Sequence, residues 1–216
     1  MLFGLSPATL LARLIVLFVG MPIHEWAHAW SAHELGDDTA SRQGRMSLNP
    51  LNHLDPWGSV LILLTGFGWA RPVPVNPYRM RMAPRAGMAL SAFAGPASNF
   101  LVAMVCAVPF RIGWLSLLDI SFGTGLPNLA TLLWLVAQVS LGLGLFNLLP
   151  FYPLDGEKVL VGVLPPDWGD RLLSFRPYSP YVLMGLLFVL PWLGLNVVGL
   201  LIGRIQAPLI SLLFWL

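Results

Sequence analysis

The chain has 216 residues, of which 56% are hydrophobic and only 10% are charged, and its formal net charge is +2. Soluble domains usually carry about a quarter charged residues, so this composition excludes an ordinary soluble domain and predicts an integral membrane protein. The arginines lie in short loops rather than along one helix face, which argues against a nucleic-acid partner. The single cysteine, Cys106, excludes a disulfide framework and a cysteine-rich metal site.

The first hydrophobic segment runs from about Pro7 to Leu35 and is long enough to span a bilayer. No cleavable signal peptide is expected, because this segment carries two histidines and a glutamate that have a role in the mature protein. Residues 57–70 are apolar but short for a crossing, so we expect a re-entrant or interfacial piece there. Residues 71–85 are cationic and interrupted by prolines.

The next two long spans are predicted over Ala86–Phe110 and Leu126–Leu149. Prolines in the polar stretch between Pro150 and Pro180 are expected to break any helix there. Residues 181–216 contain two apolar runs that meet near residues 191–196. This tail is therefore predicted to be either a helical hairpin or one long broken helix.

These segments predict an all-α polytopic membrane protein. We expect one membrane-embedded domain over residues 1–216, with a core over residues 7–160 and a C-terminal helical segment over residues 181–216. Lysine and arginine are concentrated in residues 36–85 and 150–180, and the positive-inside rule places both stretches in the cytoplasm. That orientation requires that residues 57–70 do not cross the membrane.

The stretch GMPIHEWAHAW contains an H-E-x-x-H pattern within an apolar run. His24 and His28 are four residues apart, so they lie one turn apart on one helix face and can hold one zinc ion. Glu25 can reach a water on that metal and act as a general base. The alternative is a pair of histidines that bond to neighbouring helices with Glu25 as their partner. The membrane setting favours a functional site, because an unpaired charge there costs several kcal/mol.

A catalytic zinc normally has three protein ligands and one open position. The best candidate for the third ligand is Asp155, which follows the third long span in FNLLPFYPLDG. Pro150 and Pro153 break the helix there, and Gly156 permits a tight turn, so the carboxylate can project from a non-helical end. The predicted topology puts Asp155 at the same depth as the histidines. The alternative for Asp155 is a cap or turn residue.

Four motifs occur in order along residues 20–160, namely HEWAH, GRMSLNPLNHLDPWG, AGPASN and NLLPFYPLDG. With these motifs the chain resembles the site-2 protease family of intramembrane zinc metalloproteases. The resemblance implies a core of three long transmembrane helices, a re-entrant or extended segment, and one or two C-terminal crossings. It is to a compact form, because the sequence has no counterpart of the PDZ insertion or the CBS domain of larger members.

The resemblance implies one zinc ion per chain, bound by His24, His28 and Asp155, with Glu25 as the base. It also implicates Asn147, which opens the N-x-x-P-x-x-P-L-D-G pattern, in supporting the site or the substrate.

Three further side chains have two interpretations each. His53 either helps to stabilise the negatively charged oxygen that forms during peptide hydrolysis or gates the site, or it only stabilises its own loop. Asn99 in AGPASN either acts near the active site or bonds between helices. Arg13 either shares the face of the histidines or extends outward to the lipid headgroups, and we expect the second.

The implied activity is hydrolysis of peptide bonds within or near transmembrane segments, as in regulated intramembrane proteolysis. A zinc-binding membrane protein without catalytic activity is the alternative, although such a protein has no need of Glu25. The expected partners are a membrane-protein substrate with a transmembrane segment and the lipid bilayer of the cell membrane. Residues 70–76 are expected to be extended, and their backbone edge is a candidate for holding an unwound substrate. The oligomeric state is left open.

Overall fold

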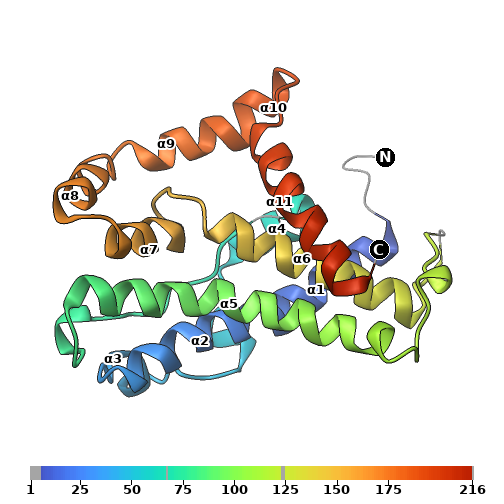
Figure 1. The fold of residues 1–216 in the computed structure, drawn as a ribbon, viewed down its shortest axis with the longest axis horizontal. Helices are drawn as coiled ribbons and strands as arrows, with labels where there is room; N and C mark the ends of the chain where they lie inside the picture. The colour runs from blue at the N-terminus through green and yellow to red at the C-terminus, as the bar shows by residue number, and fades with distance from the viewer. Residues whose placement is uncertain (1–5, 67, 123–124, 216) are drawn as a thin grey trace.

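The computed structural model describes residues 6–66, 68–122 and 125–215, and every regular element within these ranges is helical (Figure 1). Short π-helical turns join α1 to α2 and α9 to α10. The α-helices are α1 (Pro7–Ile15), α2 (Met21–Glu34), α3 (Thr39–Arg42), α4 (Pro56–Thr65), α5 (Pro84–Arg111), α6 (Leu129–Asn147), α7 (Asp155–Val163), α8 (Pro166–Ser174), α9 (Ser179–Met184), α10 (Leu190–Trp192) and α11 (Val197–Phe214).

Four helical stretches in these ranges are long and apolar enough to cross a membrane, namely Pro7–Glu34, α5, α6 and α11. The first three confirm the long spans predicted from the sequence, and α11 is a candidate for a crossing after Pro180. Helix α4 has ten residues and is about 15 Å long, so it is too short for a hydrocarbon core of about 30 Å. It belongs to the segment 57–70, of which residue 67 lies outside the described part. The chain is therefore a polytopic all-α membrane protein.

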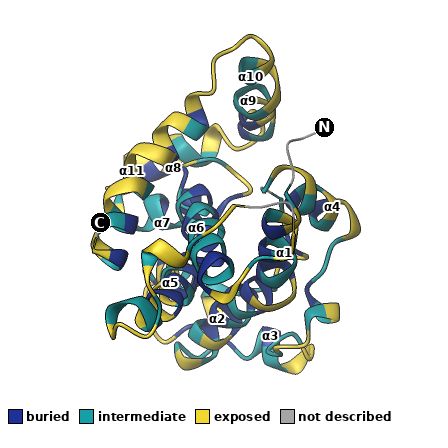
Figure 2. Ribbon diagram, turned by 90° about the vertical axis from the view of Figure 1, so that its right-hand side faces the viewer, coloured by how far each residue is buried: buried dark blue, intermediate teal, exposed yellow. Residues whose placement is uncertain are grey.

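Helix α5 lies at the centre of the bundle and contacts α2, α6 and α7. Its inward faces carry small residues such as Gly95, Ala103 and Ala107, which allow neighbouring backbones to approach closely. Ala103 and Ala107 belong to a buried apolar cluster that also includes Leu141 of α6 and Phe214 of α11. Figure 2 shows the buried residues on the faces that these helices turn toward one another.

The prediction that Arg13 extends outward to lipid headgroups is wrong. Its Nη1 atom donates a 2.8 Å hydrogen bond to the carbonyl oxygen of Leu63, in the last turn of α4. The last carbonyls of a helix have no partner within the helix and carry partial negative charge. Arg13 therefore stabilises the end of the short helix α4 and ties it to α1.

The stretch between Pro150 and Pro180 also differs from the prediction that its prolines break any helix. It contains α7 and α8, each nine residues long. Pro166 lies in the first turn of α8, and Pro180 lies in the first turn of α9, where a missing N–H costs nothing. After α8 the chain forms two helical arms, α9–α10 and α11, which meet at a turn over residues 193–196 (Figure 1).

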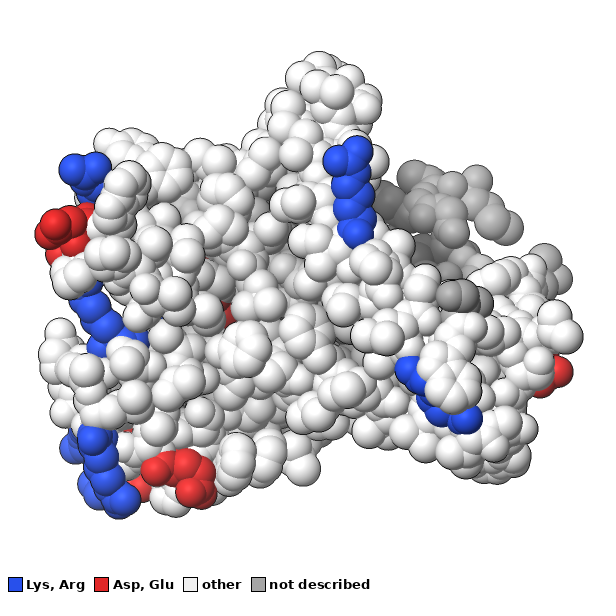
Figure 3. All heavy atoms as spheres, in the orientation of Figure 1, with Lys and Arg blue, Asp and Glu red and all other residues white. Residues whose placement is uncertain are grey.

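The charged residues gather toward the ends of the bundle. Figure 3 shows most lysine, arginine and acidic side chains of this face at the end formed by α3, α8 and the start of α5, with a largely uncharged zone beside them. Arg85 of α5 joins α8 at this end, because its Nη2 atom lies 2.5 Å from Oδ1 of Asp170. The two cationic stretches predicted to lie on one side of the membrane therefore meet at one end of the molecule.

Candidate metal centre

Three side chains from two distant parts of the sequence converge inside the bundle. His24 and His28 of α2 lie one turn apart, with their Nε2 atoms separated by 3.1 Å. The Oδ2 atom of Asp155 lies 3.2 Å from Nε2 of His24 and 3.1 Å from Nε2 of His28. All three residues are buried. The structure thus brings together the two histidines and the aspartate that the sequence indicated.

The outer nitrogens of both imidazoles have partners. Nδ1 of His28 lies 2.7 Å from the carbonyl oxygen of Ser91, which can accept the Nδ1 proton and so free the lone pair of Nε2 for a metal placed among the three ligand atoms. Nδ1 of His24 lies 3.2 Å from the side-chain amide of Asn99, which pairs with either tautomer because an amide offers a donor at one end and an acceptor at the other. Asn99 therefore agrees with both interpretations, because its hydrogen bond joins α5 to α2 and its partner is His24 of the site.

Asp155 is the first residue of α7, so the expectation that it projects from a non-helical end is wrong in part. The chain before it is non-helical, and α7 begins at the aspartate itself. A Cβ added to Gly156 would lie 2.2 Å from the carbonyl oxygen of Leu148. The glycine is needed for this close approach between the start of α7 and the end of α6.

The two carboxylate oxygens of Asp155 contact different groups. Oδ2 lies 3.2 Å from Nε2 of His24 and 3.1 Å from Nε2 of His28. The second oxygen, Oδ1, accepts a 3.2 Å hydrogen bond from Nζ of Lys158, one turn further along α7. Oδ1 is thus neutralised by an ammonium group while Oδ2 faces the imidazoles.

Helix α7 is fixed by a second ion pair. The guanidinium of Arg176 donates hydrogen bonds of 2.7 and 2.9 Å to the two carboxylate oxygens of Glu157, which is only 2% exposed. These hydrogen bonds raise the pKa of Arg176. The same guanidinium lies over the ring of Tyr152, at 5.1 Å. Arg176 therefore contacts the chain on both sides of Asp155.

The three ligand atoms fit a small divalent cation. A tetrahedral zinc ion with bonds of about 2.0–2.1 Å places its ligand atoms about 3.3 Å apart, close to the three separations found here. The space beside them is kept free by Gly95 of α5. A Cβ added there would lie 2.3 Å from Nε2 of His28 and 2.6 Å from Nε2 of His24. The donor set of two imidazoles and one carboxylate is also one that zinc prefers.

Glu25 lies beside the cluster and is buried with it. Its Oε2 atom accepts a 3.1 Å hydrogen bond from the backbone N–H of Val73. Val73 belongs to the non-helical segment 70–76, which is fixed on either side of this contact. The N–H of Arg71 donates to the carbonyl oxygen of His53, and the N–H of Asn76 donates to the buried Asp37.

A cavity of about 270 Å³ opens onto these groups. His24, Glu25, His28 and Asp155 line it, together with Asn147 and Lys158. The amide nitrogen of Asn147 donates to the carbonyl oxygen of Leu143, one turn back in α6. A second, mostly apolar cavity of about 290 Å³ shares four wall residues with the first and continues toward α4 and α9. The shared residues are Gly68, Trp69, Pro153 and Leu154.

His53 does not line the first cavity. It is fully buried beneath its own loop, where Nε2 donates a 2.7 Å hydrogen bond to the carbonyl oxygen of Ser47. Its backbone carbonyl receives the N–H of Arg71. The structure therefore places His53 beside the segment that reaches Glu25, but not at the cluster.

Sequence reasoning missed several contributors to this site, among them Ser91, Lys158, Gly95 and the backbone N–H of Val73. Lys158 carried a readable signal, because a basic residue three positions after Asp155 is its neighbour on a helix. No sequence pattern marks Gly95 as the residue that keeps the ligand space free. The N–H of Val73 is a backbone group and leaves no sequence signal.

Comparison with known proteins agrees with this geometry. The chain is 41% identical over 189 residues to "Putative zinc metalloprotease YwhC" of Bacillus subtilis, covering 86% of this chain and 84% of that protein. It is 29% identical over 186 residues to "Putative zinc metalloprotease Rip2" of Mycobacterium tuberculosis, covering 82% of this chain and 66% of that protein. The protein of the same name from Mycolicibacterium smegmatis is 26% identical over 178 residues.

No family model matches the chain, and no solved structure matches it. YwhC and Rip2 both belong to the site-2 protease family. The extent of the similarity to YwhC, over most of both chains, shows that this chain belongs to the site-2 protease family.

Proposed function

We propose that this protein is an intramembrane zinc endopeptidase that hydrolyses peptide bonds within or near the transmembrane segments of membrane proteins. The observation that carries the proposal is the convergence of His24, His28 and Asp155 beside Glu25, in one cavity inside a bundle of apolar helices. A buried cluster of four ionisable groups is costly at this location unless it has a function.

His24, His28 and Asp155 would hold one zinc ion per chain. When bound, zinc lowers the pKa of a coordinated water toward about 7 and polarises a carbonyl oxygen. Ser91 and Asn99 orient the two imidazoles from behind, as the outer partners of metal-binding histidines commonly do. Lys158 occupies the other oxygen of Asp155 and so leaves Oδ2 as the coordinating atom.

Glu25 is the general base of the proposed reaction. The N–H of Val73 holds Oε2, and the described residues provide no hydrogen-bond partner for Oε1. Oε1 can therefore take a proton from the attacking water and deliver it to the leaving amine nitrogen. Asn147 lines the same cavity and is the candidate donor to the oxygen of the scissile carbonyl. For His53 we propose the loop-stabilising role, because its contacts hold residues 47 and 71 rather than the cavity.

The expected substrate is a membrane protein with an apolar transmembrane segment. The second cavity is lined mainly by leucine, phenylalanine and other apolar side chains and adjoins the catalytic groups, which suits the apolar residues flanking the scissile bond. The density of lysine and arginine at the end formed by α3, α8 and the start of α5 supports a cytoplasmic location for that end. We propose that the site opens to the same side of the membrane. We place the protein in the cell membrane.

The central test uses purified protein in detergent with a reporter that contains one transmembrane segment. We expect about one zinc per chain, cleavage of the reporter, and loss of cleavage after chelation that zinc restores. A preparation that binds zinc tightly but leaves a panel of single-span reporters intact would favour the alternative, a zinc-binding membrane protein without catalytic activity.

The segment 70–76 offers a test of the Val73 contact. Proline at position 73 removes the backbone N–H that Glu25 accepts, and its flanking prolines already hold this residue in an extended conformation compatible with proline. A hydrogen bond to a charged group contributes about 1.5–3 kcal/mol, so Val73→Pro should lower the cleavage rate by at least about tenfold while zinc content is unchanged.

The matched control is Val73→Ala, which shortens the side chain but keeps the backbone N–H that Glu25 accepts, so it should lower cleavage much less than Val73→Pro does. Equal rates for Val73→Ala and Val73→Pro would show that the Val73 contact does not support Glu25.

A further inference from the structure

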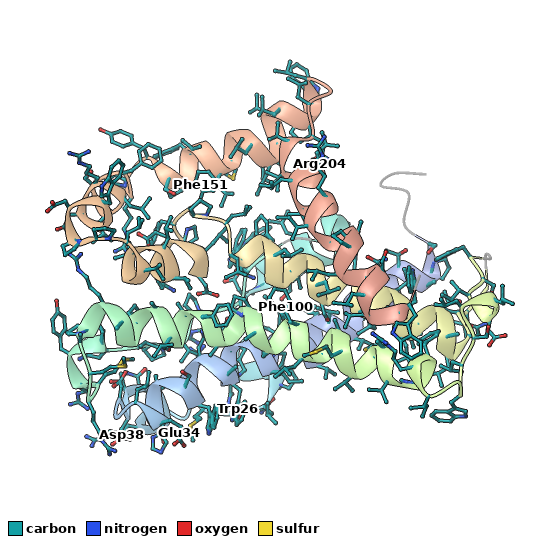
Figure 4. The ribbon with its side chains drawn as sticks, in the orientation of Figure 1. Trp26, Glu34, Asp38, Phe100, Phe151 and Arg204 are labelled. Atoms are coloured by element: carbon teal, nitrogen blue, oxygen red, sulfur yellow. The ribbon has the colours of Figure 1, made fainter. Side chains whose placement is uncertain are left out.

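Arg204 lies within a candidate span but has no partner among the residues that the structure describes. It is exposed, and no hydrogen bond or ion pair joins it to any described residue. Figure 4 places it on α11 between the two ends of the bundle, and Figure 3 shows an isolated cationic patch in an otherwise uncharged area at this position. Its exposed neighbours on α11 include Leu200, Leu201 and Ile205.

A charge at this position is costly in lipid. Helix α11 is about 27 Å long, and Arg204 lies about 10 Å from its start and about 15 Å from its end. Arginine at the centre of a membrane helix costs several kcal/mol, and such residues usually pair with an acidic group or face a polar cavity. This arginine does neither within the described chain.

Arg204 points away from the rest of the protein. The inner face of α11 carries Ile202 and Gln206, and the amide of Gln206 donates to the backbone and side-chain oxygens of Gln138 in α6. At 100° per residue, Arg204 lies about 200° from both Ile202 and Gln206. Only 22% of this span is buried, against 39–50% of the other three. The outer face of α11 is thus free for another helix.

The surface beside Arg204 allows a close approach. Gly203 and Ala207 are exposed and lie one turn apart, and a Cβ added to Gly203 would meet nothing within 4 Å. Small residues spaced by four let a second helix approach the backbone closely. These residues determine how near a partner helix can lie, whereas the charge of Arg204 determines what that helix must carry.

A second copy of this chain does not supply the missing charge. The acidic residues within the described spans are Glu25, which is buried at the site, and Glu34, which ends the first span. We propose that the outer face of α11 binds a transmembrane helix of a different protein, and that this helix carries an aspartate or glutamate that pairs with Arg204 within the membrane.

The test uses a synthetic transmembrane peptide of about 20 leucine and alanine residues with one central aspartate. The matched peptide has leucine in place of the aspartate. Binding to the full-length protein in phosphatidylcholine vesicles is measured by energy transfer between labels on the peptide and on the protein. We expect the aspartate peptide to bind about tenfold more tightly than the leucine peptide.

Arg204→Gln should abolish this preference, and Arg204→Lys, which keeps the charge, should retain it. Arg171→Gln, on the exposed surface of α8, is the matched control and should behave like the wild type. Gly203→Ile should weaken the binding of both peptides. Equal binding of the two peptides to the wild type, as expected if Arg204 reaches the lipid headgroups instead, would overturn the proposal. So would a preference that survives Arg204→Gln.

Discussion

Substitution of Glu25 by glutamine is expected to lower the rate of reporter cleavage by about a thousandfold while the protein keeps its zinc. Glutamine has nearly the same size as glutamate and can still accept the N–H of Val73, so the local packing should be retained. It cannot take a proton from water, which is the task proposed for Glu25. Zinc should remain because Glu25 is not among the three converging ligand atoms.

The matched control is Glu34→Gln, which makes the same chemical change in the same helix. Glu34 is exposed in the last turn of α2 (Figure 4) and belongs neither to the ligand cluster nor to the lining of the cavity, so cleavage and zinc content should both stay at wild-type values. Zinc content is measured by elemental analysis and cleavage by the single-span reporter. Cleavage near the wild-type rate in Glu25→Gln would remove Glu25 from the role of base. Loss of zinc in that variant would instead make Glu25 a ligand.

The long spans and the histidine pair were predictable from the sequence, because both depend on local spacing. A long apolar run must form a helix in a bilayer, where each backbone N–H and carbonyl needs a partner within the segment. Residues four apart on a helix share a face whatever surrounds them, so His24 and His28 had to be neighbours. The length of the apolar run over residues 57–70 likewise predicted a segment too short to cross the bilayer, and α4 in this region has only ten residues.

The position of Asp155 was predictable only in part. The order of the spans predicted that Asp155 lies at the same depth in the membrane as the histidines. Its approach to them also depends on how closely α7 packs against its neighbours. The close approach of α7 to the chain just after α6 requires glycine at position 156, where a side chain would collide with the carbonyl group of Leu148. The start of α7 at Asp155 was also missed, because the nearby prolines were interpreted as helix breakers rather than as residues that precede a helix.

The direction of Arg13 could not be predicted, because it depends on a partner that is distant in the sequence. From the helix alone, an arginine in an apolar segment is expected to extend toward the headgroups. The structure instead brings the end of α4 beside α1, where Leu63 offers a carbonyl without a helical partner. Long-range contacts of this kind also separate His53 from the cluster, although its motif suggested a place near the site.

Gly95→Ala should lower the affinity for zinc by at least about a hundredfold, and cleavage should be lost because the metal is lost. The added methyl group would lie 2.3 Å from Nε2 of His28 and 2.6 Å from Nε2 of His24, which is far inside van der Waals contact. Both imidazoles are held from behind by Ser91 and Asn99, so they cannot move away without losing these bonds. Changes in the outer partners of metal ligands alone cost about 10–100-fold in affinity, and direct obstruction should exceed that range.

Gly142→Ala in α6 is the matched control, because its added methyl group would meet only the side chain of Gln206, at an ordinary 3.6 Å. Both substitutions replace glycine by alanine within a membrane helix, so a general effect on helix stability should appear in both variants. Zinc affinity is measured by competition with a chelator, and folding is checked by circular dichroism and thermal unfolding. If Gly95→Ala folds normally and binds zinc as tightly as Gly142→Ala, the metal cannot lie in the space between the two imidazoles. In that case His24, His28 and Asp155 would be a hydrogen-bonded cluster rather than a ligand set.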